Sequence, residues 1–237
     1  MLTNVLKQSS ITAQICVFVL FSCFSVWAQN PSGDTLSFRQ ILANAESVEK
    51  TADSISNETT IRFEQHSILK RLNKDGSVKS TDTTIFIITK KGEKELSRKI
   101  LFSSTGETNI KKTKKREQNV DFDLNDPNYK FSLKEQDSLS YVINVKSKSR
   151  SPKKGEYEGM IIIDKENSYT KRVDFIVPKP DGKFKEFSIN TSYKIIEGGI
   201  VVPSHMQMNG FISAMMGVVK IRMAVEVRYS NYEIVTD

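Results

Sequence analysis

Cysteine is scarce in this 237-residue sequence, and its position matters more than its number. The two cysteines, Cys16 and Cys23, both precede Ala28. If the chain is cleaved after Ala28, the remainder can form no disulfide and offers no thiolate to a metal ion. Residues 29–237 do not need a disulfide, because a chain of that length buries roughly 70% of its unfolded surface.

Histidine is equally scarce, and the usual catalytic patterns are missing. His66 and His205 are the only histidines, and neither has a metal-ligand spacing. No serine lies in a nucleophile elbow, and no glycine-rich loop leads from a strand into a helix. Asp121 begins a stretch with calcium-loop spacing, yet Asp126 stands where that loop needs glycine and Ser132 where it needs glutamate. The sequence therefore predicts no enzyme, no metal site and no cofactor.

Long hydrophobic runs are absent apart from one near the N-terminus. The run from Ile11 to Phe24 follows a single charge at Lys7 and is shorter than the roughly 20 residues of a spanning helix. It leads into a small-residue cleavage pattern that ends at Ala28, which is typical of a secretory signal peptide. We therefore predict a signal peptide over 1–28, cleavage after Ala28 and a periplasmic protein.

Lipidation is an alternative to that cleavage. The stretch Leu20-Phe21-Ser22-Cys23 is a loose lipoprotein box, which would leave Cys23 acylated and anchored. Residues 24–28 continue the apolar signal, whereas the tether that follows an acylated cysteine is usually polar. The pattern therefore favours release over lipid anchoring.

The formal net charge of +7 leaves several kinds of partner open. It could favour acidic lipid headgroups or an acidic protein, or it could be spread over a solvated surface. The basic runs at 111–116 and 146–154 lack interleaved aromatic residues, so we expect no nucleic-acid binding. Both runs should lie in exposed loops, and the segment 104–127 is long enough to form a flap.

One segment after the signal has helical periodicity. Ser37 and Gln40 have the spacing of a capping box, and Leu36 can contact Ile41 as a hydrophobic staple. A helix this isolated is not stable without packing, so we expect residues 37–52 to lie on an apolar surface as a lid. The apolar residues that share one face of this helix are Phe38, Ile41, Leu42, Ala45, Val48 and Ala52.

From Asn57 onward, apolar and polar residues alternate as in strands with one buried face. Turn sequences such as 73–76 and 198–199 separate about ten such stretches. The last stretch is the clearest: odd-numbered residues from Val219 to Tyr229 are apolar, and even-numbered ones are charged except Ala224. Pro203 indicates an edge strand or a bulge.

These stretches predict a mainly β protein in which one antiparallel meander forms a single domain over 29–237. A sheet of about ten strands tends to curl. The fold we expect is an antiparallel curled sheet or an incomplete β-barrel with an N-terminal covering α-helix.

Four stretches give the sequence a resemblance to a known family. They are the helix with its charged hairpin at 73–76, then Gly159-Met-Ile-Ile-Ile-Asp164 with the strand 171–175, then Tyr193 to Pro203, and the last strand into Tyr229-Ser-Asn-Tyr232. Over residues 36–237 this order resembles the outer-membrane lipoprotein-sorting family, the LolA-like periplasmic carriers. The chain departs from the family in its long loop at 104–127 and in lacking an obvious second lid helix.

The resemblance implies a LolA-like incomplete barrel whose helical elements cover an apolar cavity. It implies a periplasmic carrier that binds the acyl chains of lipoproteins or lipids and moves them toward the outer membrane. Inner- and outer-membrane proteins of the envelope would be its partners. The alternative is an envelope sensor or adaptor that uses the same fold to bind a protein partner.

The candidate lipid contacts are apolar residues of the helix, of several strands and of the methionine-rich C-terminal region. The same side chains could instead fill a solid core. The candidate residues are Phe38, Ile41, Leu42, Ala45, Phe63, Ile85, Ile163, Val173, Phe175, Met206, Met208 and Met223.

Overall fold

The computed structural model describes residues 36–106, 124, 126–153, 155–180, 184–214 and 219–236. The chain from Phe38 to Asp237 forms one compact unit. The predicted signal peptide, most of the predicted loop 104–127 and the stretch that begins at Asp121 fall outside the described residues, apart from Leu124 and Asp126.

The predicted helix is present as α2 (Phe38–Glu58) and is longer than the sequence predicts. Its buried residues all belong to the predicted stripe. Ile55 continues the stripe by one turn and packs against the sheet, which carries the helix past residue 52. At the C-terminal end, the backbone N–H of Gly92 donates to the Ser56 carbonyl over 2.9 Å and satisfies one of the last helical acceptors.

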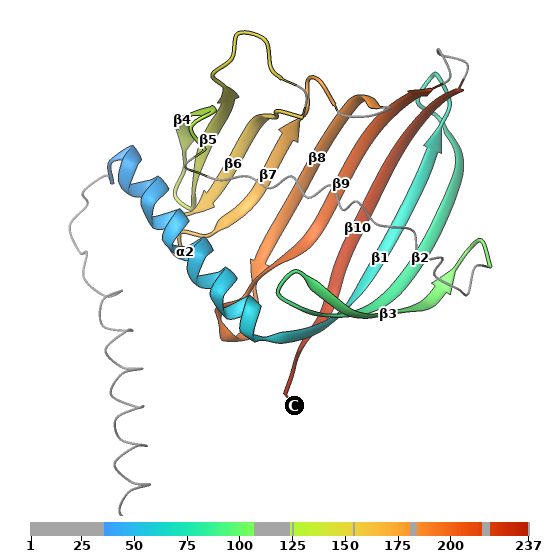
Figure 1. The fold of residues 1–237 in the computed structure, drawn as a ribbon, viewed down its shortest axis with the longest axis horizontal. Coiled ribbons are helices and arrows are strands. Elements are labelled where there is room, and N and C mark those ends of the chain that lie inside the picture. Colours follow the sequence, from blue (N-terminus) through green and yellow to red (C-terminus); the bar gives the residue numbers. More distant parts are fainter. Residues whose placement is uncertain are drawn as a thin grey trace, which may run out of the picture. The chain divides into compact units, whose positions relative to one another are not determined.

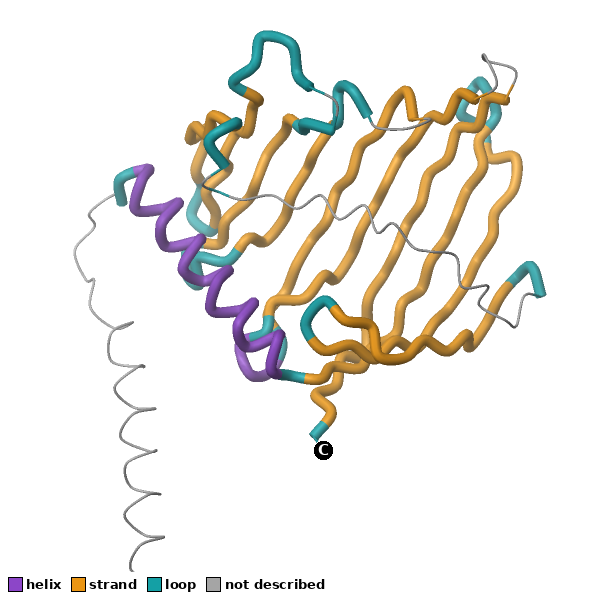
Figure 2. Tube along the Cα trace, viewed as in Figure 1, coloured by secondary structure: helices purple, strands orange, loops and turns teal. Residues whose placement is uncertain are grey.

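The strands form one sheet, which accounts for most of this unit (Figure 2). A short 3₁₀ turn, η1 (Glu197–Gly199), separates the eighth and ninth strands. The strands are β1 (Thr60–Leu72), β2 (Val78–Lys91), β3 (Lys94–Ser103), β4 (Tyr129–Gln136), β5 (Ser140–Ser147), β6 (Glu158–Asp164), β7 (Thr170–Ile176), β8 (Phe184–Ile195), β9 (Val201–Ala214) and β10 (Val219–Val235).

The strand order is β3-β2-β1-β10-β9-β8-β7-β6-β5-β4, and the sheet is not closed (Figure 1). Every recorded strand pair is antiparallel, so the predicted fold class is confirmed. One connection departs from a simple meander. β3 and β4 follow each other in sequence but form opposite edges, while β10 lies between β9 and β1.

The pairing of the last strand with the first is reinforced by aromatic contacts. Tyr229 and Tyr232 of β10 lie with their ring centroids 6.0 and 5.1 Å from that of Phe63 in β1. Rings at these separations contribute beyond the area that they bury. The contacts therefore help to join two segments that are far apart in sequence.

The two faces of the sheet differ in what covers them. Cross-strand partners share a face, so one strand's orientation fixes that of its neighbours. We call the face against which α2 packs the helix-side face. The buried residues of that face that pack with Ile55 are Ile61, Phe63, Ile88, Ile200 and Val202.

Strand β10 displays both faces in one sequence. Val227 lies on the helix-side face, since it shares its side of the strand with Tyr229, and it is buried. Arg222 and Arg228 alternate with it and are exposed. The predicted alternation of the last strand, with one wet face, is therefore confirmed.

Pro203 lies at a bulge within the sheet and not at an edge. Strand β9 is flanked by β8 and β10, and the register slips between Ser192 and Tyr193. At this bulge the Ser204 hydroxyl donates to the Ser192 carbonyl over 3.1 Å, and the Tyr232 hydroxyl donates to the Pro203 carbonyl over 2.6 Å. Of the two predicted roles for this proline, the bulge is confirmed.

A second buried region lies on β4, β6 and β7. The Tyr157 ring stacks on Tyr129, with centroids 4.4 Å apart, and lies tilted against Phe175, with centroids 4.5 Å apart. Gly159 pairs with Phe175 and has φ 154°, and a Cβ at this position would overlap the carbonyl oxygen of Asp174. The close approach of β6 and β7 therefore requires glycine at 159.

We predict that Gly159→Ala lowers the free energy of unfolding by about 3 kcal/mol, because the new methyl group meets backbone that is held by strand pairing. Gly76→Ala is the control. Gly76 also has positive φ, 84°, but its Cβ would meet nothing within 4 Å, so only about 1 kcal/mol of backbone strain is expected. Urea unfolding followed by circular dichroism compares the two variants. Equal losses would contradict the steric explanation.

Candidate functional site

Helix α2 is held on the sheet by apolar contacts and by a polar contact near its middle. Its residues Ile41 and Ala45 are buried. The Thr170 hydroxyl of β7 donates to the Glu49 carboxylate of α2. Burial, followed by the charge of Glu49, raises the pKa of Tyr193 to about 12, so this phenol stays protonated near that carboxylate. The hydrogen bond between Thr170 and Glu49 therefore lies where water has little access, and it holds the helix on the sheet.

α2 is too small to cover the helix-side face alone. Its 21 residues make a helix about 32 Å long and about 11 Å wide. Ten strands at a spacing of about 4.8 Å span about 43 Å, and a strand as long as β9 extends for about 45 Å. The helix therefore has roughly a fifth of the area of the sheet.

On the helix-side face, side chains are less buried the farther they lie from α2. In Figure 1 the helix lies across the lower ends of β6, β7 and β8, and apolar side chains of these strands such as Ile163, Val173 and Ile189 are buried. Toward the upper ends of β1, β9 and β10, large apolar side chains on the same face are only half-buried. We call this set the methionine patch: Leu69, Met206, Met208, Met223 and Val225.

The methionine patch is continuous across three strands. Leu69 of β1 pairs with Val225 of β10, which in turn pairs with Met208 of β9. Met206 and Met223 occupy the rows on either side, so the five side chains form one surface on one face of the sheet. Unbranched thioether side chains adapt their shape to what they contact, and such a surface suits a flexible apolar ligand.

The patch has an aromatic border on one side and a polar border on the other. Toward β8, Phe184 and Phe187 meet edge to face at 5.5 Å, and the Phe184 ring fills the space that a side chain at Gly210 would need. Toward β2, the Arg71 guanidinium lies 2.9 Å from the Asp82 carboxylate. The surface is therefore amphipathic at its rim and apolar at its centre.

The chemistry of this surface is apolar. The patch itself contains no titratable side chain. Among the described residues, no group of three or more histidines, cysteines and carboxylates is placed to hold a metal ion. Within the same ranges, no helix has the length and hydrophobicity needed to cross a membrane.

The predicted site residues fall into three groups, of which the largest is core. These side chains are packed against neighbours from the helix, the sheet or both, and leave little surface for a ligand. The buried members of the predicted set are Ile41, Ala45, Phe63, Ile163, Val173 and Phe175.

The second group is half-buried and consists of Phe38 and Leu42 on α2 with the three methionines of the patch. Ile85 stands alone. Its neighbour Phe86 lies on the helix-side face, and successive residues of a strand point to opposite faces. Ile85 therefore lies on the opposite face, where it pairs with His66 and Phe102. The structure brings the methionines together and does not bring Ile85 to them; lipid contact for every residue of the set stays a prediction.

Sequence reasoning missed Leu69 and Val225 as members of the patch. Val225 was visible in the alternation of the last strand, but alternation does not show which partners a residue meets. Leu69 lies beyond Gln65 and Ser67, two polar residues on the same side of β1, which hide the apolar side of that strand. Only the β1–β10 register joins Leu69 to the methionines.

Neither a protein-family model nor a curated protein matches the sequence. Among solved structures, the fold is similar to a LolA superfamily protein, NE2245 from Nitrosomonas europaea, at 12% identity and TM-score 0.42, over 81% of this chain and 94% of that one. A second match is an outer membrane lipoprotein-sorting protein domain from Vibrio parahaemolyticus (10% identity, TM-score 0.36, 82% and 94% covered). A third is the MucA/MucB complex of Pseudomonas aeruginosa (8%, 0.31, 82% and 100%).

The family that the sequence resembles is thus represented among solved structures with a similar fold. Because the TM-scores and identities are low, we draw no functional argument from these matches. The functional proposal rests on the faces, burial and register of this chain.

We predict that Thr170→Val loosens α2 without unfolding the sheet. Valine fills the space of threonine but cannot donate to Glu49, and the loss of a hydrogen bond to a carboxylate costs about 1.5 kcal/mol. Amide exchange in α2 should then speed up about tenfold while exchange in β9 and β10 is unchanged.

Thr51→Val is the matched control for this variant. Its hydroxyl donates to the Ser47 carbonyl at an exposed position of the same helix and makes no recorded bond to the sheet. Hydrogen exchange read by mass spectrometry compares both variants with the parent. Unchanged exchange of α2 in Thr170→Val would show that the bond to Glu49 does not hold the helix.

Proposed function

We propose that the protein is an exported carrier that binds an acyl chain of a lipid or lipoprotein on its helix-side face and moves it toward the outer membrane. The observation that carries this proposal is the methionine patch, a continuous apolar surface whose side chains are half-buried although they point to the core side of the sheet. Contiguous apolar surface of this kind is typical of binding sites.

The energetics favour a ligand with a long apolar chain. Burial contributes about 0.8 kcal/mol per methylene, so a sixteen-carbon chain could gain up to about 12 kcal/mol. Association and ordering remove much of that gain. The remainder is enough for binding without covalent chemistry, which agrees with the absence of titratable groups from the patch.

The helix lies on the same face as the binding surface and can shift on it. α2 is anchored by Ile41 and Ala45 in its N-terminal half, by Glu49 near its middle and by Ile55 near its C-terminal end. Only Ile41, Ala45 and Ala52 of its 21 residues are buried, and elements with few buried contacts open at low cost in free energy. We infer that α2 shifts on the sheet to widen the apolar surface that is open to an acyl chain.

The location follows from the same proposal. A carrier of acyl chains works in the aqueous space between two membranes, and the predicted signal peptide would deliver it to the periplasm. Such a carrier needs no catalytic residue and no cofactor, and we include both statements in the proposal.

The test is a single charge placed in the patch. We predict that Met208→Glu weakens palmitate binding at least about tenfold, because the bound chain would have to desolvate the new carboxylate. Binding is followed by displacement of a fluorescent anilinonaphthalene probe from the purified mature chain.

Gln207→Glu is the control and changes the adjacent residue of the same strand. Gln207 is exposed and lies on the opposite face, so palmitate binding should not change. Thermal melts by circular dichroism report whether either variant unfolds. If Met208→Glu binds palmitate as tightly as the parent does, the site is not at the patch. If that variant unfolds, the patch is part of the core.

A further inference from the structure

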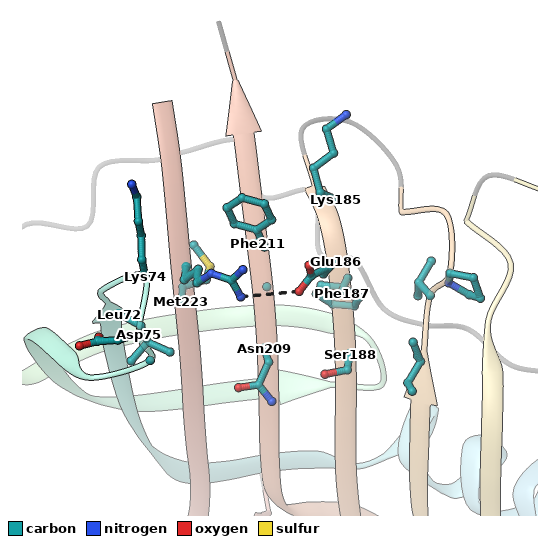
Figure 3. A pocket seen from close by; sticks show the side chains of 16 residues that line it. Leu72, Lys74, Asp75, Lys185, Glu186, Phe187, Ser188, Asn209, Phe211 and Met223 are labelled. Carbon is teal, nitrogen blue, oxygen red and sulfur yellow. Dashed lines mark ion pairs between the residues drawn. The ribbon is translucent and has the colours of Figure 1, made fainter. Parts of the chain in front are cut away.

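A second surface lies mainly on the opposite face of the sheet from α2, and Met223 of the methionine patch is also among the residues that line it. A groove of about 610 Å³ runs across the end of β1, over β10 and β9, to β8 and the end of β7 (Figure 3). One row of cross-strand partners follows it: Leu72 pairs with Arg222, Arg222 with Phe211, and Phe211 with Glu186. Because partners share a face, these four side chains lie in one line across the groove.

The floor of the groove mixes apolar side chains with polar ones such as Ser188 and Asn209, although it lies on the wet face of the sheet. Leu72 and Phe211 are half-buried there, and Ile176 is 61% exposed at the end of β7. On the same face of β10 the neighbouring residues are charged or small, so these three side chains stand out. These three side chains offer apolar contacts to a partner that enters the groove.

The rim of the groove carries more positive than negative charge. Lys74 projects from the β1–β2 turn and Lys185 from the start of β8, on either side of Phe211 (Figure 3). Neither lysine side chain has a recorded ion pair or hydrogen bond within the described part of the chain. The Arg222 guanidinium stacks over the Phe211 ring at 4.7 Å and lies 3.8 Å from the Glu186 carboxylate. It is thereby held in place by an aromatic face and a loose ion pair.

The two carboxylates of the groove offset these cations only in part. The Asp75 carboxylate accepts hydrogen bonds from the backbone N–H and hydroxyl of Ser77, over 3.0 and 2.7 Å. These bonds lower the pKa of Asp75 and turn its acceptor toward its own loop. Glu186 faces only Arg222 among the recorded ion pairs, and both lysines remain available to an external anion.

We propose that this groove binds an extended, acidic segment of a partner protein, with apolar side chains on the floor and carboxylates on Lys74 and Lys185. The row from Leu72 to Glu186 crosses three strand gaps, or about 14 Å, which an extended segment of about five residues spans. In such a segment alternate side chains point the same way, so its apolar residues can contact the floor while its acidic residues reach the lysines of the rim.

A protein segment fits the groove better than a membrane surface does. A bilayer is flat on this scale and would touch the lysines at the rim without reaching Phe211 between them. A segment of about five residues enters the groove and contacts floor and rim together. The proposal does not depend on the carrier function, because Lys74, Lys185 and Ile176, the residues changed in its test, are not part of the methionine patch.

The probe is a fluorescein-labelled octapeptide of alternating glutamate and leucine, with a lysine–leucine octapeptide as its charge-reversed counterpart. Fluorescence anisotropy measures binding to the purified mature chain at low and at physiological salt. We expect the acidic peptide to bind, to weaken as salt rises and to bind at least about tenfold less well to Lys74→Glu/Lys185→Glu, because both rim charges are reversed.

Lys130→Glu/Lys146→Glu is the matched control. These two exposed lysines pair with each other on β4 and β5, near the far edge of the same sheet, and their reversal changes the net charge equally. The control should bind the acidic peptide as the parent does, and Ile176→Ser should weaken binding without a change in charge. Circular dichroism melts confirm that the variants remain folded.

Three results would overturn the proposal. The first is equal binding of the acidic and basic peptides, and the second is equal weakening by the two double variants, which would show that only net charge matters. The third is binding to vesicles of phosphatidylglycerol and phosphatidylcholine that depends on Lys74 and Lys185 while the acidic peptide does not bind. That outcome would assign the groove to a lipid surface.

Discussion

The structure depends on a mismatch of areas: an open sheet of ten antiparallel strands presents an apolar face, and the one helix described beside it has roughly a fifth of that area. A closed barrel would cover its own interior, but here β3 and β4 remain as edges. Burial is therefore uneven on the helix-side face. It is nearly complete near α2 and on β5–β7, and it is partial on the upper ends of β1, β9 and β10.

The partly buried region has the composition that a loosely specific apolar ligand requires. Methionine side chains change shape at little cost, so they can follow an acyl chain that itself has no fixed conformation. A core made for rigidity uses branched and aromatic side chains, as the Tyr157 stack and the isoleucines of β5 and β6 do in this protein. The same face of the sheet thus carries a buried region of branched and aromatic side chains and a half-buried region rich in methionine.

The elements of the fold could be predicted from the sequence because each depends on a local pattern. The helical stripe from Phe38, the turn glycines and the alternation of β10 are all visible within a few residues. The strands that form the two edges of the sheet could not be predicted, because they depend on the pairing of β10 with β1. That pairing is stabilised by contacts between residues distant in sequence, such as Tyr232 and Phe63. For the same reason the candidate site was only partly predictable. Ile85 and Phe86 are adjacent in sequence but point to opposite faces of the sheet, and only the strand register shows which of them faces the helix. The β1–β10 register alone places Leu69 beside Val225.

The central claim is that an acyl chain occupies the helix-side face, and native mass spectrometry of the purified protein tests it most directly. The account predicts adducts with the masses of fatty acids or phospholipids, which disappear on organic extraction and return when palmitate is added. Spectra that show only the bare chain, before and after palmitate is added in excess, would contradict it.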